Sequence, residues 1–202
     1  MIKIINLQKS FGDKRIFNNF NITINDGEFV VFTGKSGCGK TTLLNIIGGL
    51  EKPDEGQVIV DDKNIYLYKN KHNYFKNTVG FLFQNFALVE NKTVKQNLSF
   101  IDKKDRTNVS FEEALCFVGL KDVLDMKIYQ LSGGEQQRVA IARLLLKKCK
   151  IILADEPTGS LDSENAFMVI NALKKLNENG KTVIMVTHDK KIIDGTSRVV
   201  QL

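Results

Sequence analysis

The chain has 202 residues, of which 43% are hydrophobic and 26% charged, and this composition excludes global disorder and a fibrous repeat. Its 29 Lys and Arg against 23 Asp and Glu give a net charge of +6, which suits polyanions such as nucleotides, nucleic acids or an acidic membrane surface, although a lysine-rich proteome would produce it too. The sequence has three cysteines without a CxxC pair and no secretory leader, which predicts reduced thiols in a cytosolic chain. No apolar run approaches the roughly 20 residues that a membrane span needs, so the chain is not expected to cross a membrane.

The predicted strands are short runs of apolar or β-branched residues between turn residues. Two of them, residues 3–7 and 21–24, flank a turn at residues 11–13 and predict a hairpin, and residues 56–60 are expected to form an edge strand. In chain order, the predicted strands cover residues 3–7, 21–24, 29–33, 56–60, 79–83, 151–154, 182–186 and 199–200.

The predicted helices repeat apolar residues at helical spacing. They cover residues 41–47, 111–119, 135–147 and 166–176. Between residues 84 and 140 the chain is polar and helical without a strong strand signal, whereas strands and helices alternate in the rest of the chain. This alternation predicts an α/β fold with a parallel sheet and helices on both of its faces.

The strongest chemical motif is a glycine-rich stretch between a predicted strand and a predicted helix. Glycines let the backbone curl so that its N–H groups point at phosphate oxygens, and the N-terminus of the next helix adds partial positive charge. We expect Lys40 to reach the β- and γ-phosphates and the Thr41 hydroxyl to bind Mg²⁺, whereas the alternative is a glycine-rich turn without this role. The motif, which fits G-x-x-x-x-G-K-[ST], consists of Gly34, Lys35, Ser36, Gly37, Cys38, Gly39, Lys40 and Thr41.

A pair of acids ends the predicted strand at residues 151–154. The carboxyl ends of parallel strands meet at one edge of the sheet, so Asp155 is predicted to lie beside the phosphate loop and to hold Mg²⁺. Glu156 is then free to act on a water molecule as the general base. The alternative is a solvated cap at a strand end.

Two further polar residues follow predicted strands of the same sheet. His188 follows residues 182–186 and could bind the γ-phosphate, and Gln84 follows residues 79–83 and could contact the metal or the attacking water. Taken alone, a histidine at a strand end is more often an ordinary loop residue, and the same caution applies to an isolated glutamine. The position of both residues favours a role in ligand binding, because ligands bind at the carboxyl ends of parallel strands.

One octapeptide identifies a family. The run Leu131-Ser132-Gly133-Gly134-Glu135-Gln136-Gln137-Arg138 is identical to the signature sequence of ATP-binding-cassette (ABC) ATPases, and the chain resembles this family over nearly its whole length. The first residues of the run form a second nest of N–H groups at the start of a helix. A serine-capped helix, with Glu135 completing a capping box, is a compatible structural reading.

The resemblance implies a P-loop NTPase (RecA-like) fold in a single ABC ATPase domain. Residues 1–83 and 141–202 would form the parallel-sheet core together with an N-terminal antiparallel β part, and residues 84–140 the inserted helical subdomain that carries the signature. In this family an aromatic residue at the position of Phe11 stacks on adenine, whereas in isolation a single Phe would be read as a core residue. Cys38 replaces the serine of many members and is a candidate for oxidation.

The resemblance also assigns roles to residues of this sequence. The catalytic residues would be Glu156, His188 and Lys40. Mg²⁺ would be held by Thr41, Gln84 and Asp155. ATP would contact Phe11, Gly34, Lys35, Ser36, Gly37, Cys38, Gly39, Lys40, Thr41, Thr42, Gln84, Ser132, Gly133, Gly134 and Asp162.

Partners follow from the same resemblance. Two cassettes of this family pack head to tail with ATP between the phosphate loop of one and the signature of the other, so we expect a homodimer. A helix of a separately encoded transmembrane permease would dock around residues 83–97, where Phe86, Leu88 and Val89 are apolar, unless these residues pack internally. The expected location is cytoplasmic, on the inner face of the membrane.

The run from Ala154 to Asp162 looks most like the branch that serves lipoprotein, macrolide and antimicrobial-peptide exporters. Only 14 residues follow His188, so we expect no accessory domain, and this length resembles compact subunits linked to bacteriocin export. Signalling through a membrane partner without transport is an alternative. A soluble role on ribosomes or DNA is a second alternative, but residues 84–131 are too few for a second cassette or a coiled coil, and no nucleic acid is expected.

Overall fold

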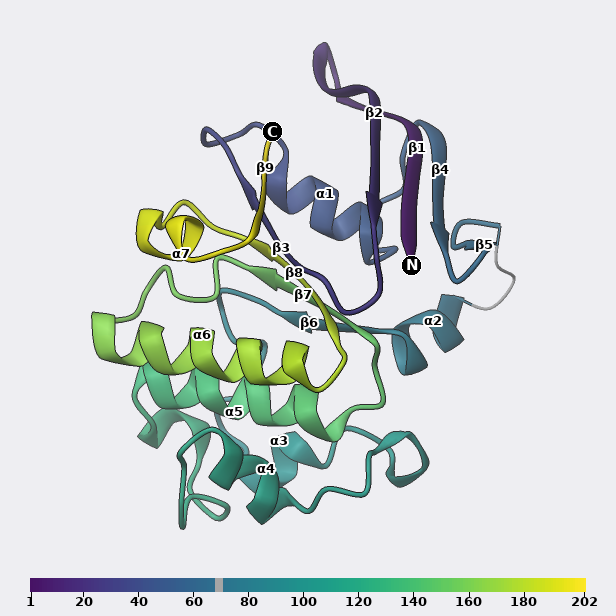
Figure 1. Cartoon of the computed structure of the whole chain (residues 1–202). Helices are drawn as coiled ribbons and strands as arrows, with labels where there is room; N and C mark the ends of the chain where they lie inside the picture. Colours follow the sequence, from purple (N-terminus) through teal and green to yellow (C-terminus); the bar gives the residue numbers. More distant parts are fainter. Residues whose placement is uncertain (68–70) are drawn as a thin grey trace.

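The computed structural model describes residues 1–67 and 71–202, which fold into two sheets with helices packed against them (Figure 1). The strands are β1 (Ile2–Phe11), β2 (Lys14–Ile24), β3 (Phe29–Thr33), β4 (Glu55–Val60), β5 (Lys63–Asn64), β6 (Val79–Leu82), β7 (Ile151–Asp155), β8 (Thr182–Val186) and β9 (Arg198–Gln201). The helices are α1 (Lys40–Ile47), α2 (Lys71–Asn77), α3 (Val94–Leu98), α4 (Phe111–Phe117), α5 (Gly133–Leu146), α6 (Ser163–Glu178) and α7 (Lys190–Asp194).

The larger sheet is parallel, with strand order β6-β7-β8-β3-β9, and the smaller one is antiparallel, with order β2-β1-β4-β5. Strands β3, β7 and β8 are apolar along their length because both faces of the parallel sheet are covered. Successive side chains of a strand point to opposite faces, so Val30 and Phe32 join one core cluster and Val31 joins the other.

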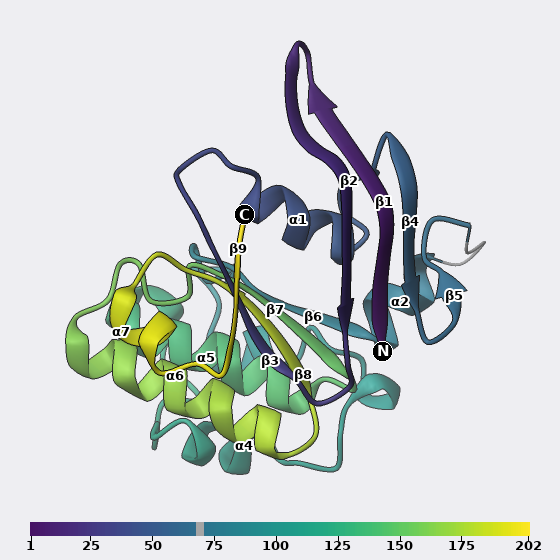
Figure 2. The ribbon, with the colours of Figure 1, turned by 45° about the horizontal axis from the view of Figure 1, so that its top comes forward.

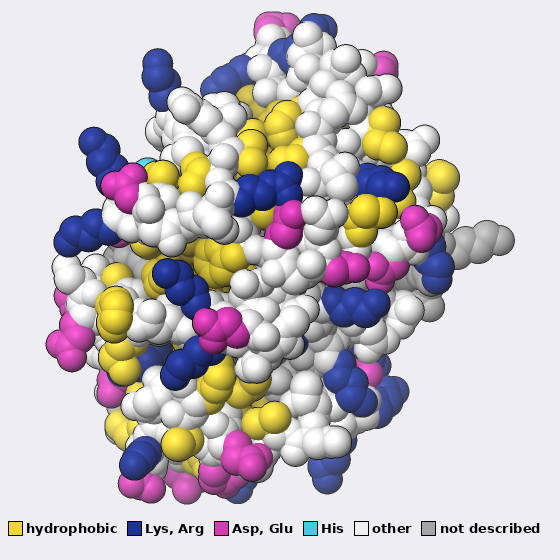
Figure 3. All heavy atoms as spheres, in the orientation of Figure 1, with side chains coloured by type: hydrophobic (Ala, Val, Ile, Leu, Met, Phe, Trp, Pro, Cys, Tyr) yellow, Lys and Arg dark blue, Asp and Glu magenta, His cyan; other side chains and the backbone are white. Residues whose placement is uncertain are grey.

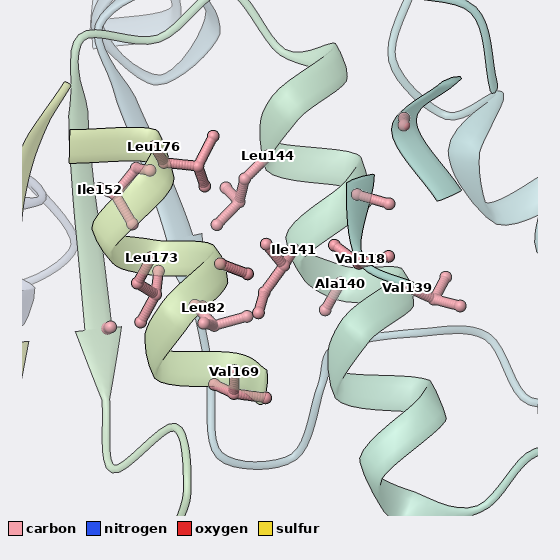
Figure 4. Close-up of a cluster of buried hydrophobic side chains, with 14 of the residues drawn as sticks. Leu82, Val118, Val139, Ala140, Ile141, Leu144, Ile152, Val169, Leu173 and Leu176 are labelled. Atoms are coloured by element: carbon pink, nitrogen blue, oxygen red, sulfur yellow. The ribbon is translucent and has the colours of Figure 1, made fainter. Parts of the chain in front are cut away.

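Different layers cover the two faces of the parallel sheet. Helix α1 and the antiparallel sheet pack on one face, and α5 and α6, with α3 and α4 beyond them, pack on the other (Figures 1 and 2). Figure 4 shows Ile141 and Leu144 of α5 in the same buried cluster as Val169, Leu173 and Leu176 of α6. The phosphate loop, which precedes α1, and the signature, which begins α5, therefore start helices on opposite faces of the sheet.

Most of the predicted elements are present. The hairpin is confirmed, but β1 and β2 are longer than the predicted strands because they continue as an exposed antiparallel ribbon to the turn between Phe11 and Lys14. The prediction that residues 56–60 form an edge strand is wrong, because β4 pairs with β1 on one side and with the two-residue strand β5 on the other. Helices α2 and α7 were not predicted, since both are short and polar.

The predicted helical region does not have a core of its own. Helix α5 begins at Gly133 and ends at Leu146, so it crosses the boundary expected after residue 140. Its buried residues and those of α3 and α4 share one hydrophobic cluster with the sheet residues Leu82, Ile152 and Val183. Helix α4 ends at Phe117, two residues earlier than the predicted helix.

Candidate functional site

The phosphate loop joins β3 to α1 and is held by its own lysine. The Nζ atom of Lys40 donates hydrogen bonds to the carbonyl oxygens of Gly34, at 2.9 Å, and Lys35, at 3.1 Å. Gly39 has a φ of 105°, and a Cβ atom there would lie 2.3 Å from Cγ2 of Ile16 in β2. Only glycine adopts this positive φ without strain and leaves room for the Ile16 side chain, so the loop can curl closely against the hairpin.

Thr41, in the first turn of α1, lies beside Asp155, the last residue of β7. The Thr41 hydroxyl donates a hydrogen bond of 3.1 Å to Oδ1 of Asp155, which confirms the prediction that Asp155 lies beside the phosphate loop. Burial raises the pKa of the Asp155 carboxyl, and the neighbouring charge of Glu156 raises it further, whereas the Thr41 hydrogen bond and the charge of Lys40 lower it. A desolvated carboxylate and a hydroxyl, both hard oxygen donors, therefore face each other at the start of α1.

Glu156 and His188 form a second pair at the same edge. The Nδ1 atom of His188 lies 2.9 Å from Oε1 of Glu156, and the backbone N–H of Glu156 donates to the carbonyl of Val186. Glu156 has a φ of 43°, an uncommon conformation for a non-glycine residue. Its other carboxylate oxygen, Oε2, is buried and has no hydrogen-bond partner among the residues that the structure describes. A buried acceptor with no donor is costly, so this oxygen is suited to accept a proton from a bound water molecule.

Gln84 lies in the same neighbourhood. Its side chain is exposed, and its Nε2 atom is 3.4 Å from the position that a Cβ atom of Gly159 would occupy. An open cavity of about 540 Å³ is lined by Phe83, Gln84, Asn85, Phe86, Asp155 and Ser160. The structure thus places Gln84 in one cavity with Asp155, as the strand-end argument predicted for ligand-binding residues.

Phe11 lies at the end of β1, beside the turn of the hairpin. Its side chain is 50% exposed, so the alternative that it is a core residue is wrong. Phe11 pairs with Lys14 in the β1–β2 ladder, and Nζ of Lys14 donates to the carbonyl of Gly37, 3.1 Å away. The exposed ring therefore belongs to the ribbon that contacts the phosphate loop. The ammonium of Lys9 lies over the Phe11 ring, 4.9 Å from the ring centroid, in a cation–π contact.

The signature begins α5 with the expected cap. Ser132 is the N-cap residue: its Oγ accepts from the N–H of Glu135 at 3.3 Å, and its own N–H donates to Oε2 of Glu135 at 2.8 Å. The Ser132 hydroxyl also donates to Oε2 of Glu135 at 2.9 Å, and the two hydrogen bonds that this oxygen accepts hold the pKa of the Glu135 carboxyl below its usual range. Within the described part of the chain, no hydrogen bond joins residues 132–134 to residues 34–41. The structure does not bring the signature to the phosphate loop of its own chain.

Two arginines of α5 were not singled out from the sequence. Arg143 donates to the carbonyls of Ala87, at 2.6 Å, and Phe86, at 3.2 Å, and both of these residues have a positive φ. Arg138 donates to Oδ1 of Asn165 in α6. The only signal in the sequence was that Arg138 precedes and Arg143 interrupts the apolar run at residues 139–146, which indicates buried partners but does not identify them.

The residues expected to receive a membrane partner lie in different environments. Leu88 packs against the core, Phe86 is half-buried and Val89 is 44% exposed. A groove of about 390 Å³ adjoins this segment at the open edge of β6, and it was not predicted. Its walls carry aromatic, cationic and acidic side chains, which include Phe75, Phe81, Phe83, Phe100, Lys76, Arg143, Lys147, Asp102 and Asp105.

Comparison with known proteins defines the class. The family described as ABC transporter matches residues 17–159, which include the phosphate loop, the signature and the acidic pair. The chain therefore belongs to the ABC transporter family. It is an ATP-binding cassette of that family, an ATPase with the P-loop NTPase fold.

Individual relatives support this assignment. The ABC transporter ATP-binding protein MJ1508 of Methanocaldococcus jannaschii is 41% identical, with all of this chain matching 95% of that protein. The lipoprotein-releasing system ATP-binding protein LolD of Leptospira interrogans is 39% identical, over all of this chain and 88% of LolD. The macrolide export ATP-binding/permease protein MacB of Campylobacter jejuni is 40% identical over all of this chain, which spans only 33% of MacB.

Among solved structures, the dimeric cassette MJ0796 superposes with a TM-score of 0.85 at 40% identity, over all of this chain and 94% of that one. The same cassette in a dimeric post-hydrolysis state bound to ADP and Pi gives a TM-score of 0.85 at 39% identity and the same coverage. Among the helices that the structure describes, none has both the length and the apolar character that crossing a bilayer requires.

Proposed function

We propose that this chain is the ATP-binding and hydrolysing subunit of an ABC exporter, that it works as a head-to-tail homodimer, and that it drives a separately encoded membrane subunit. One observation carries the proposal. The Thr41–Asp155 contact joins the phosphate loop to an acidic pair. Its second member, Glu156, has a buried oxygen that lacks a hydrogen-bond partner within residues 1–67 and 71–202. This is the arrangement that in-line attack of water on a bound phosphate requires.

Phosphate binding is proposed for residues 34–42. The loop N–H groups and the N-terminus of α1 attract phosphate oxygens, and Lys40, which bonds to loop carbonyls in this structure, would turn to the β- and γ-phosphates. The exposed ring of Phe11 would stack on the adenine, with the ammonium of Lys9 behind it.

The oxygen donors fit Mg²⁺. The Thr41 hydroxyl lies beside the half-buried Asp155 carboxyl, whose pKa is raised, so a cation bound between them would be stabilising. The Gln84 amide lines the same cavity as Asp155. No cluster of three His, Cys, Asp or Glu side chains that could hold a metal occurs in residues 1–67 and 71–202, which agrees with an ion held chiefly by substrate phosphates. When bound, Mg²⁺ would neutralise the negative charge that develops on the phosphate during the reaction.

In the proposed hydrolysis, Glu156 accepts the proton of the attacking water. His188 orients the Glu156 carboxylate through Nδ1, and its other ring nitrogen remains available to a γ-phosphate oxygen. Its 75% exposed side chain suits a residue that contacts a ligand at the surface of the protomer.

A second copy of the chain would complete the site. The signature starts a helix on the opposite face of the sheet from α1, so Ser132, Gly133 and Gly134 of one protomer would bind the ATP held by the partner. Asp162, the N-cap residue of α6, would lie in the same interface. Solved relatives described as dimeric support this arrangement.

The groove beside β6 and residues 83–97 is proposed to receive a helix of the membrane subunit. Its phenylalanines offer apolar anchors, and Phe86 lies next to it. The names of LolD and MacB favour export of a lipoprotein or a macrolide. The resemblance noted in the sequence adds a peptide or bacteriocin as a candidate cargo and favours a position of this chain on the inner face of the membrane. A nucleic-acid partner is not expected, since acidic side chains are interspersed with the basic ones on the face shown in Figure 3.

Two measurements test the proposal. Purified Glu156→Gln protein with ATP is expected to elute as a dimer, and a monomer at high protein concentration would contradict it. Co-purification with the membrane subunit is expected to be lost in Phe86→Asp and kept in Phe167→Asp, a matched control whose 68% exposed ring lies on α6. Equal binding by both variants would contradict the docking site.

A further inference from the structure

Asn165, in the first turn of α6, contacts the signature helix and Asp162 at the same time. Its backbone N–H donates to Oδ1 of Asp162 at 2.9 Å, and its Nδ2 donates to Oδ2 of the same carboxylate at 2.6 Å. Its Oδ1 accepts a hydrogen bond of 2.5 Å from Nη1 of Arg138 in α5. The amide thus connects two helices that lie side by side in Figure 1.

The chemistry of the neighbours fixes the orientation of this amide. A guanidinium only donates and a carboxylate only accepts, so the Asn165 oxygen must face Arg138 and its NH₂ group must face Asp162. Arg138 is 8% exposed, its Nε atom has no hydrogen-bond partner, and within the described residues no carboxylate forms an ion pair with it. A buried cation of this kind needs a good acceptor, and Asn165 supplies it.

The backbone of the signature also packs closely against the Asn165 side chain. A Cβ atom at Gly134 would lie 2.3 Å from both Cγ and Oδ1 of Asn165, whereas at Gly133 the nearest atom would be 3.7 Å away. Because Gly134 has no side chain, the first turn of α5 can contact the Asn165 amide of the same chain. Glycine is therefore required at this position by the fold itself, also when no nucleotide is bound.

We propose that Asn165 is a positioning residue that fixes the signature and Asp162 relative to each other, so that one protomer presents both segments to its partner as one rigid unit. The inference rests on the proposed head-to-tail dimer and names a residue on which its closure depends. Asn165 would not touch ATP bound at the phosphate loop of its own chain. Loss of its hydrogen bonds should then weaken dimer formation and leave nucleotide binding by the monomer intact.

The substitution Asn165→Asp separates these effects. It preserves the size of the side chain and the acceptor for Arg138, but it replaces the donor to Asp162 with a second negative charge. The hydrogen bonds from Asn165 hold the pKa of the Asp162 carboxyl below its usual range, so Asp162 is ionised and would be repelled. Asn171→Asp is the matched control, because it adds the same charge to α6 more than one turn further along.

The experiment measures three quantities on each variant in the Glu156→Gln background: affinity for a fluorescent ATP analogue at low protein concentration, the ATP-dependent monomer–dimer equilibrium by analytical ultracentrifugation, and the unfolding temperature. For Asn165→Asp we expect analogue affinity within about twofold of the parent and dimer affinity lower by about tenfold or more, as loss of a hydrogen bond to a charged group predicts. Asn171→Asp should have the same analogue affinity and the same dimer affinity as the parent Glu156→Gln protein.

Unchanged dimer affinity in Asn165→Asp would overturn the inference, as would an equal loss in Asn171→Asp. If Asn165→Asp does not fold, Asn165→Ala, which removes both side-chain contacts without adding charge, takes its place in the same comparison. A parent that remains monomeric with ATP would instead contradict the proposed dimer itself, and the inference with it.

Discussion

Glu156 and His188 end neighbouring strands of the parallel sheet, and Nδ1 of His188 lies 2.9 Å from Oε1 of Glu156. The histidine thus holds one carboxylate oxygen, while the other is buried and has no hydrogen-bond partner in the described part of the chain. This pairing orients the base without using the oxygen that would accept a proton. It indicates a division of roles between the two side chains, which substitution of each can separate.

Glu156→Gln is expected to lower ATP turnover by about 10²–10⁴-fold, the usual contribution of a general base, and to leave ATP affinity unchanged. His188→Ala should lower turnover less, because Glu156 would remain in place with less restraint. Steady-state phosphate release and ATP binding measure both effects, with the exposed Glu178→Gln as the control. If His188→Ala lost more turnover than Glu156→Gln, the assignment of the base would be wrong.

Asp155→Asn is expected to stabilise the ligand-free protein and to abolish Mg²⁺-dependent hydrolysis. Burial raises the pKa of Asp155 in the folded state above its unfolded value, so its charge destabilises the fold at neutral pH and the penalty diminishes as the pH falls through the folded pKa. An amide still accepts the Thr41 hydrogen bond. The unfolding temperature should therefore rise at pH 7, and the rise should become smaller as the pH is lowered. A lower unfolding temperature would refute this.

Glu135→Gln tests the charge at the start of the signature helix. Hydrogen bonds from Ser132 depress the folded pKa of Glu135, so its contribution is present above the unfolded value near 4.5 and is lost as the pH falls through the folded pKa. We expect a loss of about 0.3–1 kcal/mol at pH 7 that disappears in acid, measured by urea unfolding across pH.

Glu113→Gln provides the comparison for that variant, since Glu113 completes the same capping box with Ser110 at the start of α4. The two substitutions should have similar effects on stability, and only Glu135→Gln should change ATP-dependent dimer formation. A loss of stability at Glu135 that did not depend on pH would exclude the charge as its cause.

Arg143→Met removes the donor to the carbonyls of Phe86 and Ala87. Leaving such carbonyls unpaired costs about 1–3 kcal/mol, and both residues have a left-handed backbone that the arginine holds. Lys147→Met is the matched variant: Lys147 lines the same groove and donates to the carbonyls of Phe75 and Val79. Both variants should unfold at lower temperature, and only Arg143→Met should also raise the Mg²⁺ concentration needed for half-maximal turnover, because its segment adjoins Gln84. Equal Mg²⁺ dependence would contradict this.

The sequence predicted those parts of the fold that single segments encode. Continuous apolar runs gave β3, β7 and β8, because burial on both faces requires them. The contact between Thr41 and Asp155, 114 residues apart, followed from a rule about parallel strands rather than from spacing. The interior position of β4 could not be predicted, since its outer neighbour β5 has two residues and no hydrophobic pattern.

The contacts of Asn165 and Arg143 were beyond prediction for a different reason. Each depends on how a helix packs: Asn165 meets Arg138 where α6 crosses α5, and Arg143 meets the carbonyls of a loop more than 50 residues earlier. Side-chain type gives no partner in such cases, because an asparagine in a first helical turn or an arginine in a helix is compatible with a solvent-exposed role.

The central claim is that each site combines the phosphate loop of one protomer with the signature of the other, and a mixing experiment tests it most directly. Glu156→Gln lacks the base, and Gly133→Asp, for which the structure leaves room, would place a negative charge before the partner's phosphates while remaining acceptable at a helix N-terminus. Mixed before ATP is added, the two inactive variants should hydrolyse ATP well above the sum of their separate rates, because a mixed dimer contains one intact composite site. A rate equal to that sum, with both variants folded and mixed dimers present, would contradict the claim.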